Sequence, residues 1–225
     1  MSEKHYAVAV DGPSGAGKST LARAAAAKLG ILYVDTGAIY RTIGCAAARR
    51  GLDPHDEAAV GAMLPELSIS MTYGPDGLQH MLLNGEDVTE EIRRPEISMY
   101  ASAVSALPAV RAYLLEMQRD MARKRSVIMD GRDIGTVVLP EAEVKIFLTA
   151  SSEVRARRRC AELEQRGTPK PYDEVLAELN ERDYNDSHRA VAPLRPAPDA
   201  VIVDTSALDF EQSERALLRV IEERI

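Results

Sequence analysis

The stretch Gly12-Pro13-Ser14-Gly15-Ala16-Gly17-Lys18-Ser19 decides the fold. It matches the pattern G-x-x-x-x-G-K-[ST] at every fixed position. The apolar run 7–10 before it predicts a buried strand, and residues 18–29 after it predict a helix that ends at Gly30. A loop of this pattern between a strand and a helix is the arrangement that binds nucleotide phosphates.

The chemistry of this loop follows from its residue types. Glycines let the backbone turn closely, so that successive N–H groups face the phosphates, and the start of the helix adds its positive dipole end. Lys18 is expected to reach the β- and γ-phosphates, and the Ser19 hydroxyl is expected to bind Mg²⁺. The residues predicted to bind ATP are Gly12, Pro13, Ser14, Gly15, Ala16, Gly17, Lys18, Ser19 and Thr20. By itself the loop predicts binding of ATP or GTP and leaves the activity open, because enzymes, switches and motors all use it.

The rest of the chain alternates apolar strands with amphipathic helices. Further strands are predicted at 31–34, 126–129, 144–148 and 200–203, and helices at 37–50 and from about 108, 151, 173 and 209. This alternation is typical of an α/β protein with a parallel sheet covered on both faces.

One stretch departs from that alternation. Residues 67–73 and 78–83 are short alternating runs on either side of Gly74-Pro75-Asp76-Gly77, which predicts an antiparallel hairpin. We therefore expect a core domain of residues 1–61 and 103–225 and an inserted subdomain of residues 62–102.

Composition limits the class of protein. The net charge of −7 and the pI near 5.3 disfavour a general nucleic-acid binder. Of the 28 basic residues 22 are Arg, which either fits a small anionic ligand in a local positive pocket or reflects the composition of the source genome. Two distant cysteines, and the lack of a secretory signal or a long apolar run in this sequence, predict a cytoplasmic protein without a membrane partner.

Polar residues follow two of the predicted strands. Thr36 is expected to cap the helix after the second strand, and Arg41 one turn later is expected to face an anion rather than solvent. Asp130, Arg132 and Asp133 follow the strand at 126–129, where an acid typically orients a magnesium-bound water. The charged groups here either pair with one another or bind a ligand, and the nearby phosphate loop favours a ligand.

The helix from about residue 173 carries an unusual stripe. Val175 and Leu179 predict its buried face, and Arg182, Asp186 and Arg189 continue at the same spacing. An Arg–Asp pair along a helix is worth only a few tenths of a kcal/mol and does not explain the shared face. The pattern indicates a helix that leaves the core and lines a cleft.

A second arginine group precedes that helix. Arg155, Arg158 and Arg159 share one helical face, and a turn rich in Gly and Pro follows at 165–171. This arrangement predicts a mobile lid over about 158–172 whose arginines approach the transferred phosphate. The alternatives are an RNA-binding patch, which the absence of interleaved aromatic residues disfavours, or a solvated face.

Together these residues resemble the bacterial cytidylate kinases, a branch of the nucleoside monophosphate kinase family. The similar stretches are 11–21, 35–41, 84–88 with 92–93, 130–136, 144–148 with 151–153, and 189–194, so the resemblance covers nearly the whole chain. It implies a three-layer P-loop kinase fold with a five-stranded parallel sheet, an antiparallel monophosphate-binding insert and a helical lid.

The resemblance also implies a reaction and a site. The expected reaction moves the γ-phosphoryl of ATP, with Mg²⁺, to CMP or dCMP and gives ADP and CDP or dCDP. Nothing in the sequence demands a dimer, so a monomer is expected. The implied acceptor residues are Thr36, Tyr40, Arg41, Ser102, Arg111, Arg132, Asp133, Arg182, Asp186 and Arg189. The strand end adds Asp130 to this site, and the catalytic set expected from the loop, the strand end and the lid is Lys18, Arg132, Arg155, Arg158 and Arg159. Alternatives are a kinase for another small acceptor such as UMP, or a regulatory NTP- or RNA-binding module.

Overall fold

Five strands form one sheet in the computed structural model, which describes residues 5–74 and 77–225. Their order is β2 (Leu32–Asp35), β6 (Val127–Gly131), β1 (Ala7–Asp11), β7 (Val144–Thr149) and β8 (Val201–Asp204). β1 pairs in parallel with β6 and β7, and β7 pairs in parallel with β8. Every residue of β1 is buried, as expected for the central strand of a parallel sheet. The predicted α/β fold with a five-stranded parallel sheet is confirmed.

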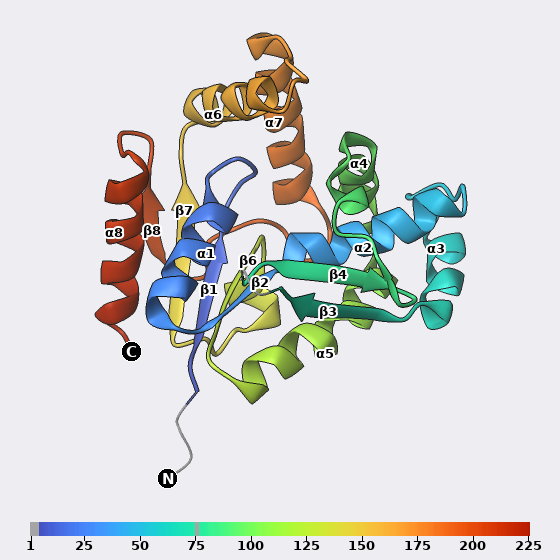
Figure 1. The fold of residues 1–225 in the computed structure, drawn as a ribbon, viewed down its shortest axis with the longest axis horizontal. Helices are drawn as coiled ribbons and strands as arrows, with labels where there is room; N and C mark the ends of the chain where they lie inside the picture. Colours follow the sequence, from blue (N-terminus) through green and yellow to red (C-terminus); the bar gives the residue numbers. More distant parts are fainter. Residues whose placement is uncertain (1–4, 75–76) are drawn as a thin grey trace. The chain divides into compact units, whose positions relative to one another are not determined.

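Helices connect these strands (Figure 1). They are α1 (Lys18–Leu29), α2 (Thr36–Arg49), α3 (Glu57–Met63), α4 (Pro95–Val104), α5 (Pro108–Lys124), α6 (Ser152–Gln165), α7 (Tyr172–His188) and α8 (Phe210–Glu222). Three short helical segments join them: η1 (Leu64–Glu66), η2 (Glu91–Arg93) and the single π-turn η3 (Ile134–Val138). Within the described ranges, none of the helices combines the length and the apolar character that crossing a bilayer requires.

The internal contacts divide the chain into two units. The first contains Met1–Tyr33 and Ala122–Ile225, and the second contains Val34–Met121. The insert that the sequence predicts at 62–102 falls inside the second unit, and its own boundaries stay a prediction.

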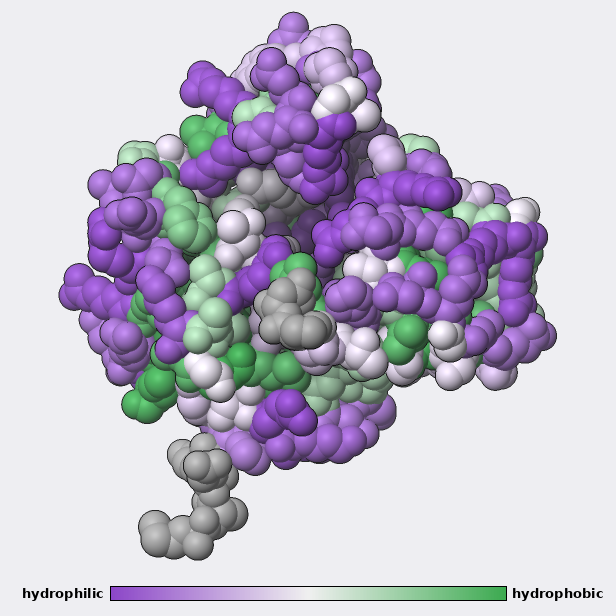
Figure 2. Space-filling model, in the orientation of Figure 1, coloured by the Kyte–Doolittle hydropathy of each residue, from purple (hydrophilic) through white to green (hydrophobic). Residues whose placement is uncertain are grey.

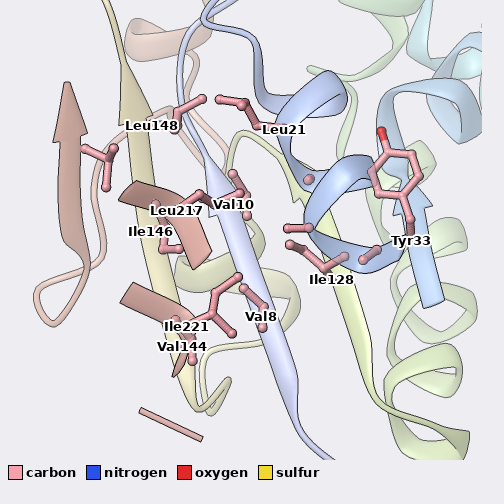
Figure 3. Close-up of a cluster of buried hydrophobic side chains, with 14 of the residues drawn as sticks. Val8, Val10, Leu21, Tyr33, Ile128, Val144, Ile146, Leu148, Leu217 and Ile221 are labelled. Atoms are coloured by element: carbon pink, nitrogen blue, oxygen red, sulfur yellow. The ribbon is translucent and has the colours of Figure 1, made fainter. Parts of the chain in front are cut away.

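The first unit has its core between the sheet and two helices (Figure 3). Side chains of β1 and β7, among them Val8, Val10 and Ile146, pack against Leu217 and Ile221 of α8 and against the buried face of α1. Each of these fully buried aliphatic side chains contributes roughly 1.5–3 kcal/mol to folding. This packing fixes the carboxyl end of β1, where the phosphate loop begins.

A smaller cluster joins α6 to α7 in the same unit. Ala156 and Leu163 of α6 pack against Val175 and Leu179 of α7. The outer surface of this pair is hydrophilic, as the purple side chains around α6 and α7 show in Figure 2. The two helices therefore form one amphipathic hairpin with its own apolar centre.

The second unit contains the predicted hairpin. β3 (Ile69–Tyr73) and β4 (Gln79–Leu83) pair antiparallel, and the two-residue strand β5 (Glu86–Asp87) extends the sheet. The N–H of Gly77 donates to the carbonyl of Gly74 at 2.9 Å, which closes the turn. Two residues of the predicted turn, Pro75 and Asp76, lie outside the described residues.

Candidate active site

The phosphate loop leaves β1 through a backbone position that only glycine can occupy. A Cβ at Gly12, whose φ is +150°, would lie 1.9 Å from the carbonyl oxygen of Leu148 on β7. At the other end of the loop, Gly17 adopts a left-handed conformation and caps α1. The glycines at both ends of the motif are therefore required by the path of the chain.

Lys18 is buried beneath this loop. Its Nζ donates a hydrogen bond to the carbonyl oxygen of Pro13 at 2.7 Å. Burial, and next the positive charge of Arg132, lower the pKa of Lys18 to about 7, while Asp130 opposes the shift. A phosphate group beside Lys18 would reverse this effect, because an opposite charge favours the ammonium form.

Ser19 and Asp130 form the candidate magnesium site. The Ser19 hydroxyl donates to Oδ2 of Asp130 at 2.7 Å, and the Tyr33 hydroxyl donates to Oδ1 at 3.0 Å. Within residues 5–74 and 77–225, no group of three or more His, Cys, Asp or Glu side chains is placed to hold a metal. One hydroxyl and one carboxylate fit Mg²⁺ all the same, because Mg²⁺ usually completes its shell with phosphate oxygens and water.

Asp11 is a site feature that the sequence interpretation missed. Its buried carboxylate accepts hydrogen bonds from the N–H groups of Ile134 and Gly135, each at 2.7 Å. Burial raises the pKa of Asp11 to about 6, although these two donors oppose that shift. The end of β1 is thereby tied to the turn after β6, which carries Arg132 and Asp133. An acid closing an otherwise apolar strand was the available sequence signal.

Two ion pairs link that turn to α7 and the residue after it. Nε of Arg132 donates to Oδ2 of Asp186 at 2.8 Å, and Nη2 of Arg189 donates to Oδ1 of Asp133 at 3.2 Å. Burial opposes ionisation of Asp186, but Arg132 and then Arg182 outweigh it and hold the pKa of Asp186 below its ordinary value. The four predicted residues of the two pairs are brought together.

The stripe predicted on α7 is confirmed in part. Val175, Leu179 and Asp186 are buried and Arg182 is half-buried, so the face does turn from apolar to charged. Arg189 does not belong to the helix, contrary to the prediction. α7 ends at His188, and Arg189 is extended, with φ −61° and ψ 144°. Its Nε donates to the carbonyl of Ala192 at 2.7 Å, so the following loop orients it instead of the helical repeat.

The three arginines of α6 contact protein groups in this structure. Arg155 donates to the carbonyl oxygens of Ala150 and Ser14, both at 2.9 Å. Arg158 donates to the carbonyl of Thr205 at 2.8 Å, and Arg159 pairs with Glu162 at 2.8 Å. Their predicted contacts with phosphate stay a prediction, as does the lid.

The remaining predicted residues, Thr36, Tyr40, Arg41, Ser102 and Arg111, belong to the second unit. The cap of α2 is Asp35, whose carboxylate accepts from the N–H of Ala38 at 2.9 Å, so the prediction of Thr36 as the cap was wrong by one residue. A carboxylate is an equally good cap, and β2 extends one residue further than predicted.

Arg111 is buried in the second unit. Its guanidinium carbon lies 5.5 Å from the centre of the Tyr40 ring, and Nη1 donates to the carbonyl of Ser105 at 3.0 Å. The buried face of α5 combines the apolar Val110 and Leu114 with Arg111 and Gln118. Tyr40, Arg41 and Ser102 are half-buried.

The parallel sheet, the strand–loop–helix phosphate loop and the Ser19–Asp130 pair define a protein of the P-loop class. Within that class, the family model described as "Cytidylate kinase" matches residues 8–223. The chain belongs to the cytidylate kinase family.

Relatives of known name support that assignment. The chain is 48% identical over 217 residues to a cytidylate kinase of Caldicellulosiruptor bescii, with 96% of each chain covered. It is 50% identical over 214 residues to a cytidylate kinase of Carboxydothermus hydrogenoformans, covering 95% of this chain and 96% of that one. The solved structure of an uncharacterized protein from Eubacterium ventriosum is similar in fold alone, with a TM-score of 0.52, 12% identity and coverage of 98% and 100%.

Proposed function

We propose that the protein transfers the γ-phosphoryl group of ATP to CMP, and also to dCMP, giving ADP and CDP or dCDP in pyrimidine nucleotide metabolism. Membership of the cytidylate kinase family supports this reaction. The observation that carries it is geometric: Asp130 at the end of β6 accepts from Ser19 of the phosphate loop at 2.7 Å, and Arg132, two residues further on, pairs with Asp186 of α7 at 2.8 Å. Donor-side and acceptor-side groups thus share one charged environment within the first unit.

The donor half of the proposed site consists of the phosphate loop and the start of α1. The loop N–H groups and the dipole of α1 receive the phosphates of ATP, and Lys18 exchanges its bond to the Pro13 carbonyl for phosphate oxygens. Ser19 and Asp130 would hold Mg²⁺, which would neutralise negative charge on the phosphates of ATP.

The acceptor half recognises a nucleoside monophosphate. Arg132 is proposed to bind the CMP phosphate, and Asp133, Arg182 and Asp186 are proposed to bind the base or sugar. Arg189 holds Asp133 through their ion pair and completes this set. In the second unit the proposed acceptor residues are Thr36, Tyr40, Arg41, Ser102 and Arg111.

The chemical step is a direct in-line displacement. An oxygen of the CMP phosphate attacks the γ-phosphorus of ATP, the bond from the γ-phosphorus to the bridging oxygen breaks, and ADP leaves. No protein nucleophile is required, because the acceptor itself supplies the attacking oxygen. Lys18, Arg132 and the arginines of α6 neutralise the charge that develops, and exclusion of water protects ATP from hydrolysis.

The same proposal covers the protein's setting. We propose a monomer that acts in the cytoplasm on small nucleotides, without a nucleic-acid or membrane partner. The net charge of −7 supports the absence of nucleic acid. A UMP kinase would share the fold, but the named relatives favour cytidylate. An NTP- or RNA-binding regulator would leave the Arg132–Asp186 and Asp133–Arg189 pairs without a role.

An acceptor competition assay tests the proposal. ADP formation is measured with MgATP and equal concentrations of CMP, dCMP, UMP or AMP, together with a control that contains no acceptor. We expect CMP to give the highest kcat/KM, dCMP to be used as well, and the control to be slower by at least about 100-fold, since water lacks the binding that aligns CMP. A higher kcat/KM for UMP or AMP, or acceptor-independent hydrolysis alone, would contradict the proposal.

A further inference from the structure

Asp183 occupies a position on α7 to which neither the family resemblance nor the proposed reaction gives a role. Its Oδ2 lies 2.7 Å from Nη1 of Arg155 on α6. The Asp183 side chain is 22% exposed and that of Arg155 only 6%, so this ion pair is largely removed from solvent. Leu179 and Asp183 are four residues apart, which places Asp183 over the α6–α7 apolar cluster.

The partner of Asp183 is anchored directly to the phosphate loop. The same Nη1 of Arg155 donates to the carbonyl oxygen of Ser14 at 2.9 Å, and Nε donates to the carbonyl of Ala150 at 2.9 Å. A Cβ added at Gly15 would lie 3.4 Å from Cβ of Arg155 and 3.8 Å from Leu179. The loop that is proposed to hold ATP therefore rests on α6 and α7, and one guanidinium joins its backbone to Asp183.

The other end of the connection lies on the acceptor side of α7. Asp186, one turn after Asp183, pairs with Arg132 at 2.8 Å. A continuous path thus runs from the Ser14 carbonyl through Arg155 and Asp183 along one helical turn to Asp186 and Arg132. All of these residues belong to the first unit.

The two carboxylate oxygens of Asp183 differ in their surroundings. Among the described residues, its Oδ1 is a buried atom for which no hydrogen-bond partner is present. Oδ2 lies on the guanidinium that also holds the backbone of the phosphate loop, so the position of this carboxylate and that of the loop depend on the same arginine.

We propose that Asp183 is a positioning residue that couples the phosphate loop to α7, so that ATP in the loop and CMP at α7 strengthen each other's binding. The coupling runs through Arg155, whose position depends on both the loop carbonyl and the carboxylate. Binding of either nucleotide stabilises the same arrangement of α6, α7 and the loop, and the effect is reciprocal by thermodynamic necessity. The inference rests on the proposed function, since it takes CMP and ATP as the two ligands.

The test is the change in CMP affinity caused by a non-hydrolysable ATP analogue with Mg²⁺, measured by calorimetry. In the wild type we expect the analogue to lower the Kd for CMP by about fivefold or more, the usual lower range of such coupling. In Asp183→Ala we expect the analogue to change the Kd for CMP by less than about twofold. Glu181→Ala, which removes an exposed carboxylate from the same helix, should retain the wild-type factor.

Asp183→Asn keeps the shape of the side chain and serves if the alanine variant does not fold; it should also lower the factor. A wild-type factor in the Asp183 variants would overturn the inference, even if both affinities fell together, because that result indicates a purely structural role. If the wild type binds both nucleotides but the ATP analogue leaves the Kd for CMP unchanged, the coupling inference is overturned and the proposed function stands. A wild type that binds no CMP would overturn the proposed function itself.

Discussion

At the scale of single residues, the protonation of Lys18 depends on whether a phosphate group is bound. Without phosphate, its Nζ contacts the Pro13 carbonyl in a buried site beside Arg132, and burial lowers its pKa to about 7. The phosphates of ATP would replace a neutral acceptor by negative charge. The lysine would then hold its proton well above pH 7.

This pKa shift predicts that ATP binding takes up a proton. Above the pKa of about 7 the free protein has lost the Lys18 proton, whereas the complex retains it, so affinity for MgATP should fall as pH rises from 7 to 9. Calorimetry at pH 8 in buffers of different ionisation enthalpy should report an uptake of about one proton per ATP, and at pH 6 an uptake near zero. Equal apparent enthalpies in all buffers at pH 8 would contradict this account of Lys18.

The positions of the candidate site residues were predictable where a motif fixes the spacing. The phosphate loop, Asp130 and the Arg132–Asp133 pair follow strands in the expected way. Asp183 was missed because the stripe on α7 was continued from Leu179 to Arg182, three residues further on. Asp183 lies four residues after Leu179 and therefore falls near the same helical face. The burial of Arg111 was missed because the pattern of apolar residues does not show where a Tyr ring and a backbone carbonyl solvate a guanidinium.

At the scale of elements, α8 shows how the local sequence determines where a helix begins. α8 begins at a full capping box: Asp209 accepts from the N–H of Gln212 at 2.8 Å, and the Gln212 side chain accepts from the N–H of Asp209 at 3.1 Å. Two N–H groups that the start of a helix would leave unsatisfied are thus paired. Leu217 and Ile221 then bury the helix against the sheet (Figure 3).

Removing the capping box should lower the stability of the protein and leave its activity unchanged. Asp209→Ala should lower the free energy of unfolding by about 1 kcal/mol and the melting temperature by about 2–4 °C. Its kcat/KM for the nucleotides should equal that of the wild type, because α8 carries no proposed site residue. Glu211→Ala is the matched control, since Glu211 is exposed and its ion pair with Arg215 spans 3.6 Å. A melting temperature no lower than that of the control would refute the capping role.

The predicted ends of strands and helices lie within one or two residues of those in the structure, although the helices α3 and α4 were not predicted, and the early end of α7 has a physical cause. The helical spacing of the stripe continues to Arg189, past the end of α7, but Arg189 turns away because the N–H of Leu194 donates to the carbonyl of Asp186 at 2.8 Å and folds the loop back. That bond joins residues eight apart, and no helical repeat contains it. The loop after a helix can therefore set where the helix ends.

At the scale of the whole molecule, the order of strands and helices along the chain was enough to predict a parallel α/β sheet with an antiparallel insertion. The division into two units was not predictable in detail. The boundary after Tyr33 lies inside β2, where the sequence runs on without a break. The choice of cytidylate as acceptor came from resemblance across the chain, because arginines and carboxylates alone specify an anion and not a base.

The central claim is that the γ-phosphoryl group of ATP passes directly to CMP. The most direct test is a single-turnover reaction with enzyme in excess over ATP that carries a radioactive γ-phosphate, quenched at intervals and separated by chromatography. The account predicts that all transferred label appears in CDP, with an equal amount of ADP and with no labelled protein. Label released as inorganic phosphate in the presence of CMP, or label held covalently by the protein, would contradict it.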